Sequence, residues 1–524
     1  MVTNSPNCGS CAFVSKMGAE MQAVDVLLAL PRHLQHEVLS RLSAGQVHNV
    51  RLATRALRHM VDSAARIITV QGSAGSVDMP AVEAMLRRTV SAEGPQWRLP
   101  VLAVKLDICK DVVYNGASTN VDLYVDTVLT TLPAARFVRN LQVHIMNLHG
   151  LAQPDRPGTA TSRGSDNLYL DAQLTKGLAR AFDAIRTATG AHVSAYVDTC
   201  DLTPRSAAGE TAATRKASKD ACDALALLGH VDALRVHGAA PHLAATLPGL
   251  RSLTHLSCVP WPALLAPPAD PDHPSGDAWA PIEGLARLQH LELHAPDPAT
   301  RNGTPSCIFA PLPGLSSLSK LVLDQVNLSQ LAWQHAACGA LQDLHLHLSV
   351  WAAETVRVLP RGLKRLHLST DAARHLSVAS HHHARYEGPR GEHALAHLTG
   401  LSELILDCCF DGLLPLPPLP SLTTLAVNAR AFRLGPVFAG DDACAEPATR
   451  VRRLFVMGCQ SYLACCMGGG RVLLQTAKTL RQQLEREAAF AALEEVVPFA
   501  QGLRSQVLES TRLELMTMVH RRRE

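Results

Sequence analysis

Leucines recur in a regular pattern in the second half of the chain. Segments such as GLARLQHLELH and GLSSLSKLVLD repeat the spacing L-x-x-L-x-x-L-x-L, in which the last two leucines alternate with other residues. Alternation of this kind indicates a short β-strand with one buried side, because successive strand side chains point to opposite faces. The leucines that open the predicted strands are Leu256, Leu291, Leu321, Leu344, Leu366, Leu404 and Leu425.

The steps between these leucines predict the architecture. They are 21 to 23 residues long at three places and 30 to 38 residues long where insertions interrupt the pattern. The shorter steps match the length of leucine-rich repeats. One repeat cannot bury its own leucines, so such repeats fold as a stack of parallel strands. We therefore predict an α/β solenoid, an irregular leucine-rich-repeat array with a parallel sheet, over residues 231–460.

Residues 71–230 show the same kind of pattern in a more divergent form. Apolar and polar residues alternate over Val104–Ile108 and over Leu141–Ile145, which predicts two strands. Leu170–Thr189 has helical periodicity and is followed by Gly190, a typical helix stop. We expect divergent early repeats here, separated by polar loops over 153–166 and 203–219.

A different pattern occupies Leu30–Val61. Leu30, Leu34, Val38 and Leu42 fall four residues apart and so lie on one side of a helix. Pro31 suits a first helical turn, and Ser43 with Gln46 forms a capping box that begins a second helix. The pattern predicts two or three short helices with an apolar side that something else must cover.

This stretch resembles an F-box in its Leu-Pro start, its two helical stripes and its ending near Arg55 to Val61. It departs from that family at His33, Thr54 and Leu57, where an acidic residue, Cys and Trp are usual. The resemblance implies a small all-α motif over residues 23–70 that docks on the Skp-type adaptor of a cullin–RING ubiquitin ligase. The residues expected to contact the adaptor are Leu30, Pro31, Leu34, Val38, Leu39, Leu42, Val47, Val50 and Leu57. The alternative is a helical hairpin that only packs on the domain behind it.

The two ends of the chain complete the predicted organisation. Residues 1–22 are expected to form a disordered tail, in which the lone pair Cys8 and Cys11 lacks the second pair of a zinc site. Residues 461–524 are expected to form a helical cap over the last repeat, because Arg471–Glu495 is rich in helix formers.

Composition excludes several classes of protein. Aromatic residues make up 4% of the chain and the formal net charge is +3, which argues against a nucleic-acid-binding protein. No apolar run is long enough to span a bilayer, so we expect no membrane partner. The 14 cysteines lack a regular spacing and are expected to be reduced thiols, which favours a cytoplasmic or nuclear location.

Between the stacked leucines lie residues of the opposite, predicted concave face, where histidine is frequent. The residues expected to bind a target protein are Arg235, His237, His290, Glu292, His294, His345, His347, Arg365, His367 and Glu403. Neighbouring parallel strands are about 4.8 Å apart, so His294, His347 and His367 are candidates for a cluster. A polar face that contacts an acidic segment of a partner is favoured over a pH-sensitive or metal-binding patch.

No catalytic residue, metal ligand or cofactor is expected, because no phosphate-binding, dinucleotide-binding, zinc-protease or nucleophile-elbow motif is present. The combined signals predict a substrate-recognition subunit of an SCF-type ubiquitin ligase, which binds the adaptor and an unidentified target and performs no bond chemistry itself. The alternatives are a leucine-rich-repeat scaffold without a ligase role and, in third place, a metal-dependent hydrolase built on the histidines.

Overall fold

The computed structural model describes about half of the chain. The described residues are Gln35, Val38, 66–72, 78–107, 121–146, 172–199, 212–236, 242–259, 276–294, 308–309, 314–324, 327–328, 339–347, 356–357, 359–369, 394–407, 415–428, 437–438, 449–457, 482 and 484–498. They fall into two compact units, the first ending near Asp198 and the second containing most of the residues that follow. Each unit is described by itself.

Unit 1 is a four-stranded parallel sheet with helices between its strands. Its elements are β1 (Ile67–Gly72), α5 (Met79–Glu93), β2 (Leu99–Asp107), α7 (Val121–Leu129), α8 (Leu132–Ala135), β3 (Val138–Met146), α9 (Ala172–Thr189) and β4 (His192–Thr199). The strands pair in chain order, β1-β2-β3-β4. The alternating stretches predicted as strands lie in β2 and β3, where Val104, Leu106, Leu141, Val143 and Ile145 are buried.

Helix α9 confirms both the predicted helical stripe and its end. Leu174, Leu178, Phe182 and Ile185 recur at helical spacing and are all buried. The helix ends before Gly190, whose φ is +67° and whose N–H donates to the carbonyl of Arg186 at 2.9 Å. A residue with positive φ closes the last turn, and glycine adopts that conformation without strain.

Three segments of the early chain differ from the sequence prediction. Helix α5 forms where only strands and loops were expected, and α10 (Ala212–Leu225) begins inside the range 203–219 that was predicted as a polar loop. Strand β1 begins at Ile67, inside the range expected for the all-α motif. Ser, Thr and Gly obscure the helical signal before α10, although Cys222 and Leu225 are buried three residues apart on one side of that helix.

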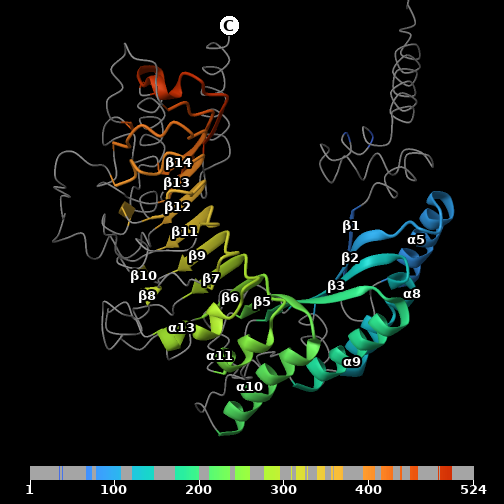
Figure 1. Cartoon of the computed structure of the whole chain (residues 1–524). Coiled ribbons are helices and arrows are strands. Elements are labelled where there is room, and N and C mark those ends of the chain that lie inside the picture. Colours follow the sequence, from blue (N-terminus) through green and yellow to red (C-terminus); the bar gives the residue numbers. More distant parts are fainter. Residues whose placement is uncertain are drawn as a thin grey trace, which may run out of the picture. The chain divides into compact units, whose positions relative to one another are not determined.

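Unit 2 contains the leucine-rich array. After α10 and η1 (Ala226–Leu228) its elements are β5 (Val231–Val236), α11 (Leu243–Thr246), η2 (Leu247–Gly249), β6 (His255–Cys258), α13 (Gly276–Glu283), β7 (His290–His294), β8 (Ile308–Phe309), β9 (Lys320–Asp324), β10 (Asn327–Leu328), β11 (Asp343–His347), β12 (Arg365–Ser369), β13 (Glu403–Asp407), β14 (Thr424–Asn428), β15 (Arg453–Met457), η5 (Ala488–Phe490) and β16 (Glu495–Pro498). Helices α10, α11 and α13 lie on the same side of strands β5 to β7 (Figure 1).

The strands of unit 2 pair in chain order and all in parallel. The order is β5-β6-β7-β9-β11-β12-β13-β14-β15-β16, while β8 and β10 form a separate pair. This is an α/β fold with sequentially paired parallel strands, consistent with a repeat solenoid such as a leucine-rich-repeat array. The described helices include none that combines the length and apolar character needed to cross a membrane.

The register of these strands places leucine opposite leucine. The residues predicted to open the strands, Leu256, Leu291, Leu321, Leu344, Leu366, Leu404 and Leu425, are direct neighbours across the sheet. Each is at most 1% exposed. Burial of a leucine side chain stabilises a fold by about 1.5–3 kcal/mol, so the rows of leucines form the core that holds the repeats together.

Backbone hydrogen bonds at the strand entrances fix the same register. The carbonyl of Gln289 accepts from the N–H groups of Ser319 and Lys320, both at 2.9 Å. In the same way, two consecutive N–H groups of the following repeat donate to one carbonyl at Thr254, Ser319, Gln342, Lys364, Ser402, Thr423 and Arg452. One carbonyl has two lone pairs, so each repeat ties two successive residues of the next repeat to a single atom.

The L-x-x-L spacing closes a tight turn in front of each strand. The N–H of Leu288 donates to the carbonyl of Leu285 at 2.9 Å, and Leu318 donates to Leu315 at 3.0 Å in the same way. Hydroxyl groups add bonds to the preceding repeat, as where Thr254 donates to the carbonyl of Asp232 at 2.8 Å. The turn buries both leucines and aims the chain into the strand.

The segment expected to be a helical cap contains one more strand. β16 pairs in parallel with β15, with Val496 opposite Leu454, so the sheet continues past residue 460. The helix predicted over Arg471–Glu495 does not reach its expected end, because the 3₁₀ turn η5 and then β16 take its place. Phe490, Leu493 and Val496 follow the repeat spacing and are buried, and this burial overrides the local helix propensity.

A buried carboxylate supports this last repeat. Glu487 is 7% exposed and accepts hydrogen bonds from the backbone N–H groups of Val437 at 2.9 Å and Phe438 at 3.2 Å. Phe438 also pairs by an isolated bridge with Leu416 and packs edge-on against Phe490 at 5.8 Å between ring centroids. Glu487 therefore joins residues far apart in the sequence at the end of the array.

Two glycines, each directly before a leucine of the repeat, offer a comparative test of the packing. A Cβ added at Gly314 would lie 2.5 Å from the carbonyl oxygen of Glu283, whereas one added at Gly400 would have its nearest neighbours at 3.8 Å. We expect Gly314→Ala to lower the free energy of unfolding by about 1–3 kcal/mol, because backbone must move. Gly400→Ala should leave it unchanged or raise it by about 0.5 kcal/mol. Urea unfolding of both variants measures the difference, and equal losses would contradict the packing described for Gly314.

Candidate functional site

The strand positions between the leucines line the opposite face of the unit 2 sheet. Three rows of cross-strand neighbours run over this face. The first row contains His255, His290, Lys320, Asp343, Arg365 and Glu403. The second row contains Arg235, Ser257, Glu292, Val322, His345 and His367, and the third contains His294, Asp324, His347 and Ser369. We call these residues, Val322 excepted, the polar strand face. The spacing of the leucines places these side chains within reach of one another, because side chains alternate along each strand.

Glu292 is the most enclosed charge of this face, with a side chain 14% exposed. Nε2 of His290 lies 2.9 Å from one carboxylate oxygen, and the other oxygen is 3.1 Å from the guanidinium of Arg235 and 3.6 Å from Nε2 of His294. Interactions with His290, then His294, and to a lesser degree Arg235, hold the pKa of this carboxyl group far below its usual value. Glu292 is therefore a fixed negative charge around which three other side chains are oriented.

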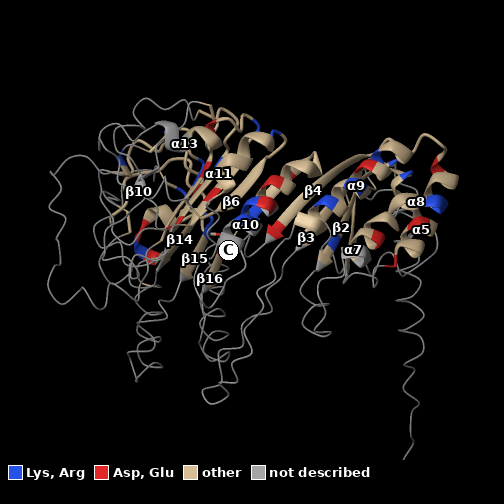
Figure 2. Cartoon of the chain, turned by 90° about the horizontal axis from the view of Figure 1, so that it is seen from below, with Lys and Arg blue, Asp and Glu red and all other residues tan. Residues whose placement is uncertain are grey.

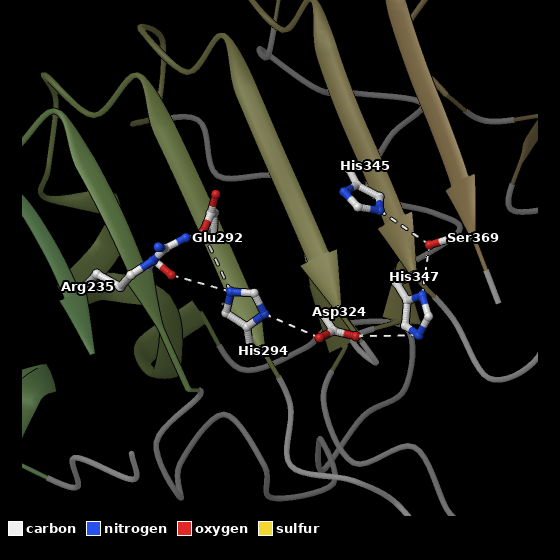
Figure 3. Close-up of polar contacts among 8 residues, drawn as sticks. Arg235, Glu292, His294, Asp324, His345, His347 and Ser369 are labelled. Atoms are coloured by element: carbon white, nitrogen blue, oxygen red, sulfur yellow. Dashed lines mark hydrogen bonds and ion pairs between the residues drawn. The ribbon is translucent and has the colours of Figure 1, made fainter. Parts of the chain in front are cut away.

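His294 lies between two carboxylates. Its Nδ1 is 3.3 Å from Asp324, and its Nε2 faces Glu292 and is 3.3 Å from the hydroxyl of Ser257 (Figure 3). The hydrogen bond with Asp324, followed by that with Glu292, raises the pKa of His294 to about 9. The side chain is thus an imidazolium at neutral pH, and it links β7 to β9 by charge-assisted contacts.

The chain of contacts continues through His347 and Ser369. Nε2 of His347 is 3.9 Å from Asp324, its Nδ1 is 2.8 Å from the hydroxyl of Ser369, and that hydroxyl is 3.3 Å from Nε2 of His345 (Figure 3). We assign the hydrogens from this network. The carboxylate favours a hydrogen on Nε2 of His347, so its Nδ1 accepts from Ser369 and Ser369 accepts from His345.

His345 and His367 are stacked face to face. Their ring centroids are 3.8 Å apart and the ring planes differ by 12°. Burial lowers the pKa of both to about 4, and nearby histidines add to the shift, so both rings are neutral at pH 7. Nε2 of His367 is buried and has no hydrogen-bond partner among the described residues.

The remaining predicted residues of this face are placed as follows. Arg365 is 63% exposed and lies 3.7 Å from Asp343 and 3.6 Å from Glu403. His290 packs edge-on against His255 with ring centroids 5.4 Å apart. His237 lies outside the described residues.

The expected histidine cluster is divided between two groups. His294 and His347 both contact Asp324, whereas His367 belongs to the second row and stacks on His345. Asp324 and Ser369, which connect these groups, were not among the predicted binding residues. The sequence could have indicated both residues, because Asp324 has the same place in its repeat as His294, and Ser369 the same place as His347.

Unit 1 contains a separate stacked pair. His144 of β3 stacks on Tyr196 of β4 with ring centroids 4.4 Å apart, and the amide of Gln142 donates to the Tyr196 hydroxyl at 3.2 Å. Burial, and the charge of Lys105 in second place, lower the pKa of His144 to about 4. Like Nε2 of His367, Nε2 of His144 is buried without a hydrogen-bond partner among the described residues, but the ring stacked on it is a tyrosine and not a second imidazole.

The predicted adaptor-binding residues are almost entirely outside the described part of the chain. Val38 is described: it is helical and 37% exposed. Leu30, Pro31, Leu34, Leu39, Leu42, Val47, Val50 and Leu57 lie outside the described residues. Adaptor binding therefore stays a prediction from the sequence.

Clustered metal-ligating side chains and cysteine thiols are two further kinds of candidate site. Over the residues that the structure describes, no group of three His, Cys, Asp or Glu side chains is arranged to hold a metal ion. Cys222 and Cys258 are buried, and burial raises the pKa of the Cys222 thiol to about 11.

Sequence comparisons add no relative. No protein-family model matches the chain, and no curated protein matches it either. The class is defined by architecture alone, as an α/β protein whose strands pair in sequence order in a parallel sheet, consistent with a repeat solenoid.

The imidazolium of His294 gives a prediction with a defined pH window. Its folded pKa of about 9 is above the 6.5 of an unfolded histidine, so its stabilisation is complete below pH 6.5 and is lost as the pH rises through 9. We expect His294→Gln to lower the free energy of unfolding by about 1 kcal/mol at pH 6.5, a modest loss because water screens a partly exposed pair. The difference from the unmodified chain should shrink towards pH 9.5. Denaturant titrations at several pH values test this, and a difference independent of pH would contradict the assigned charge.

Proposed function

We propose that the polar strand face binds a partner protein and that the chain presents this partner to a ubiquitin ligase as a non-catalytic receptor. The observation that supports binding is the connected set of polar contacts running from Arg235 on β5 to Ser369 on β12. Side chains held by one another lose little conformational freedom when a partner binds, which favours recognition.

The ligase half of the proposal is supported by the F-box-like sequence of Leu30–Val61. Such a motif would lay its apolar helical faces into a groove of a Skp-type adaptor, which connects to a cullin–RING ligase. The array would then hold the target near the ubiquitin-loading enzyme and act by raising effective concentration. The role requires no cofactor and no bond chemistry from this chain, and we place it in the cytoplasm or nucleus.

The second candidate is a protein-interaction scaffold without a ligase role. The regular sheet and the polar strand face support it equally well, because neither depends on the N-terminal helices. The two candidates differ in what covers the apolar side of Leu30–Val61: another protein in the first case and this chain itself in the second.

Adaptor binding is tested with the full chain. We expect Leu34→Lys combined with Leu42→Lys to reduce capture of a Skp-type adaptor at least about tenfold, because a charge in an apolar groove costs more than 1.4 kcal/mol. Ile67→Lys is the matched control, since Ile67 is 61% exposed and lies on β1, outside the F-box-like stretch Leu30–Val61. A pull-down with quantified adaptor measures the effect.

The scaffold candidate predicts a different result for the same variants. The unmodified chain would then show no adaptor binding at micromolar concentration, and the double variant would lose solubility or unfold at lower denaturant concentration. Adaptor binding by the unmodified chain that survives the double substitution would contradict the assigned contact residues.

Target binding is tested by reversing a charge on the polar strand face. Arg365→Glu should weaken the binding free energy of specific partners by about 1–3 kcal/mol, as expected for an arginine in an interface, and so reduce the amount of each partner that is captured. Arg361→Glu is the matched control, because Arg361 is also exposed but lies in the turn before β12. Affinity purification with quantitative mass spectrometry compares the two, and identical partner lists and amounts would contradict this face as the binding surface.

A further inference from the structure

The stacked imidazoles of His345 and His367 are an unusual feature for a strand face. Two neutral rings 3.8 Å apart leave Nε2 of His367 buried and without a hydrogen-bond partner among the described residues. A buried unsatisfied polar atom is costly, and a ligand that pairs with it removes that cost. Ser369 and His347 stand directly beside the pair and hold His345 in place.

Charged and titratable groups face the pair from every strand beside it. They are Lys320 and Asp324 on β9, Asp343 and His347 on β11, Arg365 on β12 and Glu403 on β13. Asp324 is engaged by His294, while Asp343 and Glu403 both lie within 3.7 Å of Arg365. Lys320 adds a positive charge that opposes protonation of His345.

The polar strand face carries charges of both signs. Arg235, His294, Lys320 and Arg365 are among its cations, and Glu292, Asp324, Asp343 and Glu403 are its carboxylates. His345 and His367 are neutral at pH 7, so each proton that they take up adds one positive charge. Acidification can therefore only make this part of the face more positive.

We propose that His345 and His367 form a proton-linked binding site for a carboxylate from an acidic segment of the partner protein. This inference rests on the proposed role of the polar strand face and specifies the chemistry that it recognises. Carboxylate is the occupant that fits, because it compensates two like charges that would otherwise repel each other across the stack.

Binding and protonation are then reciprocal. Each imidazole takes one proton from solvent, the two like charges separate the rings, and Nε2–H of His367 becomes available as a donor to the entering carboxylate. A bound anion raises the pKa of both imidazoles above the value of about 4 in the free chain. Affinity therefore rises as the pH falls from 7 towards 5, by up to tenfold per pH unit for each proton taken up.

The test measures binding of a hepta-glutamate peptide to the full chain by calorimetry at pH 7.0, 6.0 and 5.5. We expect the dissociation constant to fall at least about tenfold between pH 7.0 and 5.5, while circular dichroism shows that the chain stays folded. A neutral hepta-serine peptide should not bind at any pH. The combined variant His345→Phe and His367→Phe keeps a stacked aromatic pair that cannot titrate, and it should lose most of this pH dependence.

His144→Phe is the matched control, because His144 is also stacked, partly buried and neutral at pH 7 but lies in unit 1. This variant should bind the peptide like the unmodified chain. No saturable binding at pH 5.5, or the same pH dependence in the double phenylalanine variant, overturns the proposal. If that variant does not fold, NMR titration of the unmodified chain decides: two imidazole pKa values that rise with peptide support the site, and unchanged values overturn it.

These results are separable from those on the proposed function. In the proposed role, adaptor capture depends on Leu30–Val61 and does not involve the histidine pair. If the peptide does not bind but the adaptor is captured, only the proposed carboxylate site is refuted. If the adaptor is not captured but the peptide binds, only the proposed ligase role is refuted.

Discussion

The register between successive repeats is the constraint on which the rest of unit 2 depends. Leucines at two positions of each strand are buried against the leucines of the next, as at Leu321 and Leu344. The carbonyl before each strand accepts two N–H groups from the following repeat, as Gln289 does from Ser319 and Lys320. A slip of one residue would expose the leucines and bury the polar positions, so hydrophobic burial and backbone bonding select the same alignment.

The same register builds the candidate site. Because one side of each strand is committed to leucine, the other side brings positions one, three and five of neighbouring strands into contact. Insertions lengthen the steps from β7 to β9 and from β12 to β13, yet His290, Asp343 and Glu403 occupy equivalent places. Chain excursions between repeats thus leave the face intact, which allows a rigid surface to be assembled from distant parts of the sequence.

Histidines of the same strand face nevertheless differ in charge, and their neighbours explain the difference. His294 sits between the carboxylates of Glu292 and Asp324 and is an imidazolium. His345 and His367 stack on each other, partly removed from water, and are neutral. The face therefore carries a fixed ion-pair network on β5 to β9 and an adjacent pair of rings that can still accept protons.

Sequence alone determined the parallel array, because the L-x-x-L-x-L spacing is local and repeats often enough to identify each strand. It also determined helix α9 and its end at Gly190. It could not determine β16, where burial of Phe490 and Leu493 overrides local helix propensity, nor α10, whose polar composition resembles a loop. Only the tertiary structure decided that Asp324 joins His294 to His347 while His367 stacks on His345, because contacts between strands depend on register, and register becomes fixed only when all the repeats pack together.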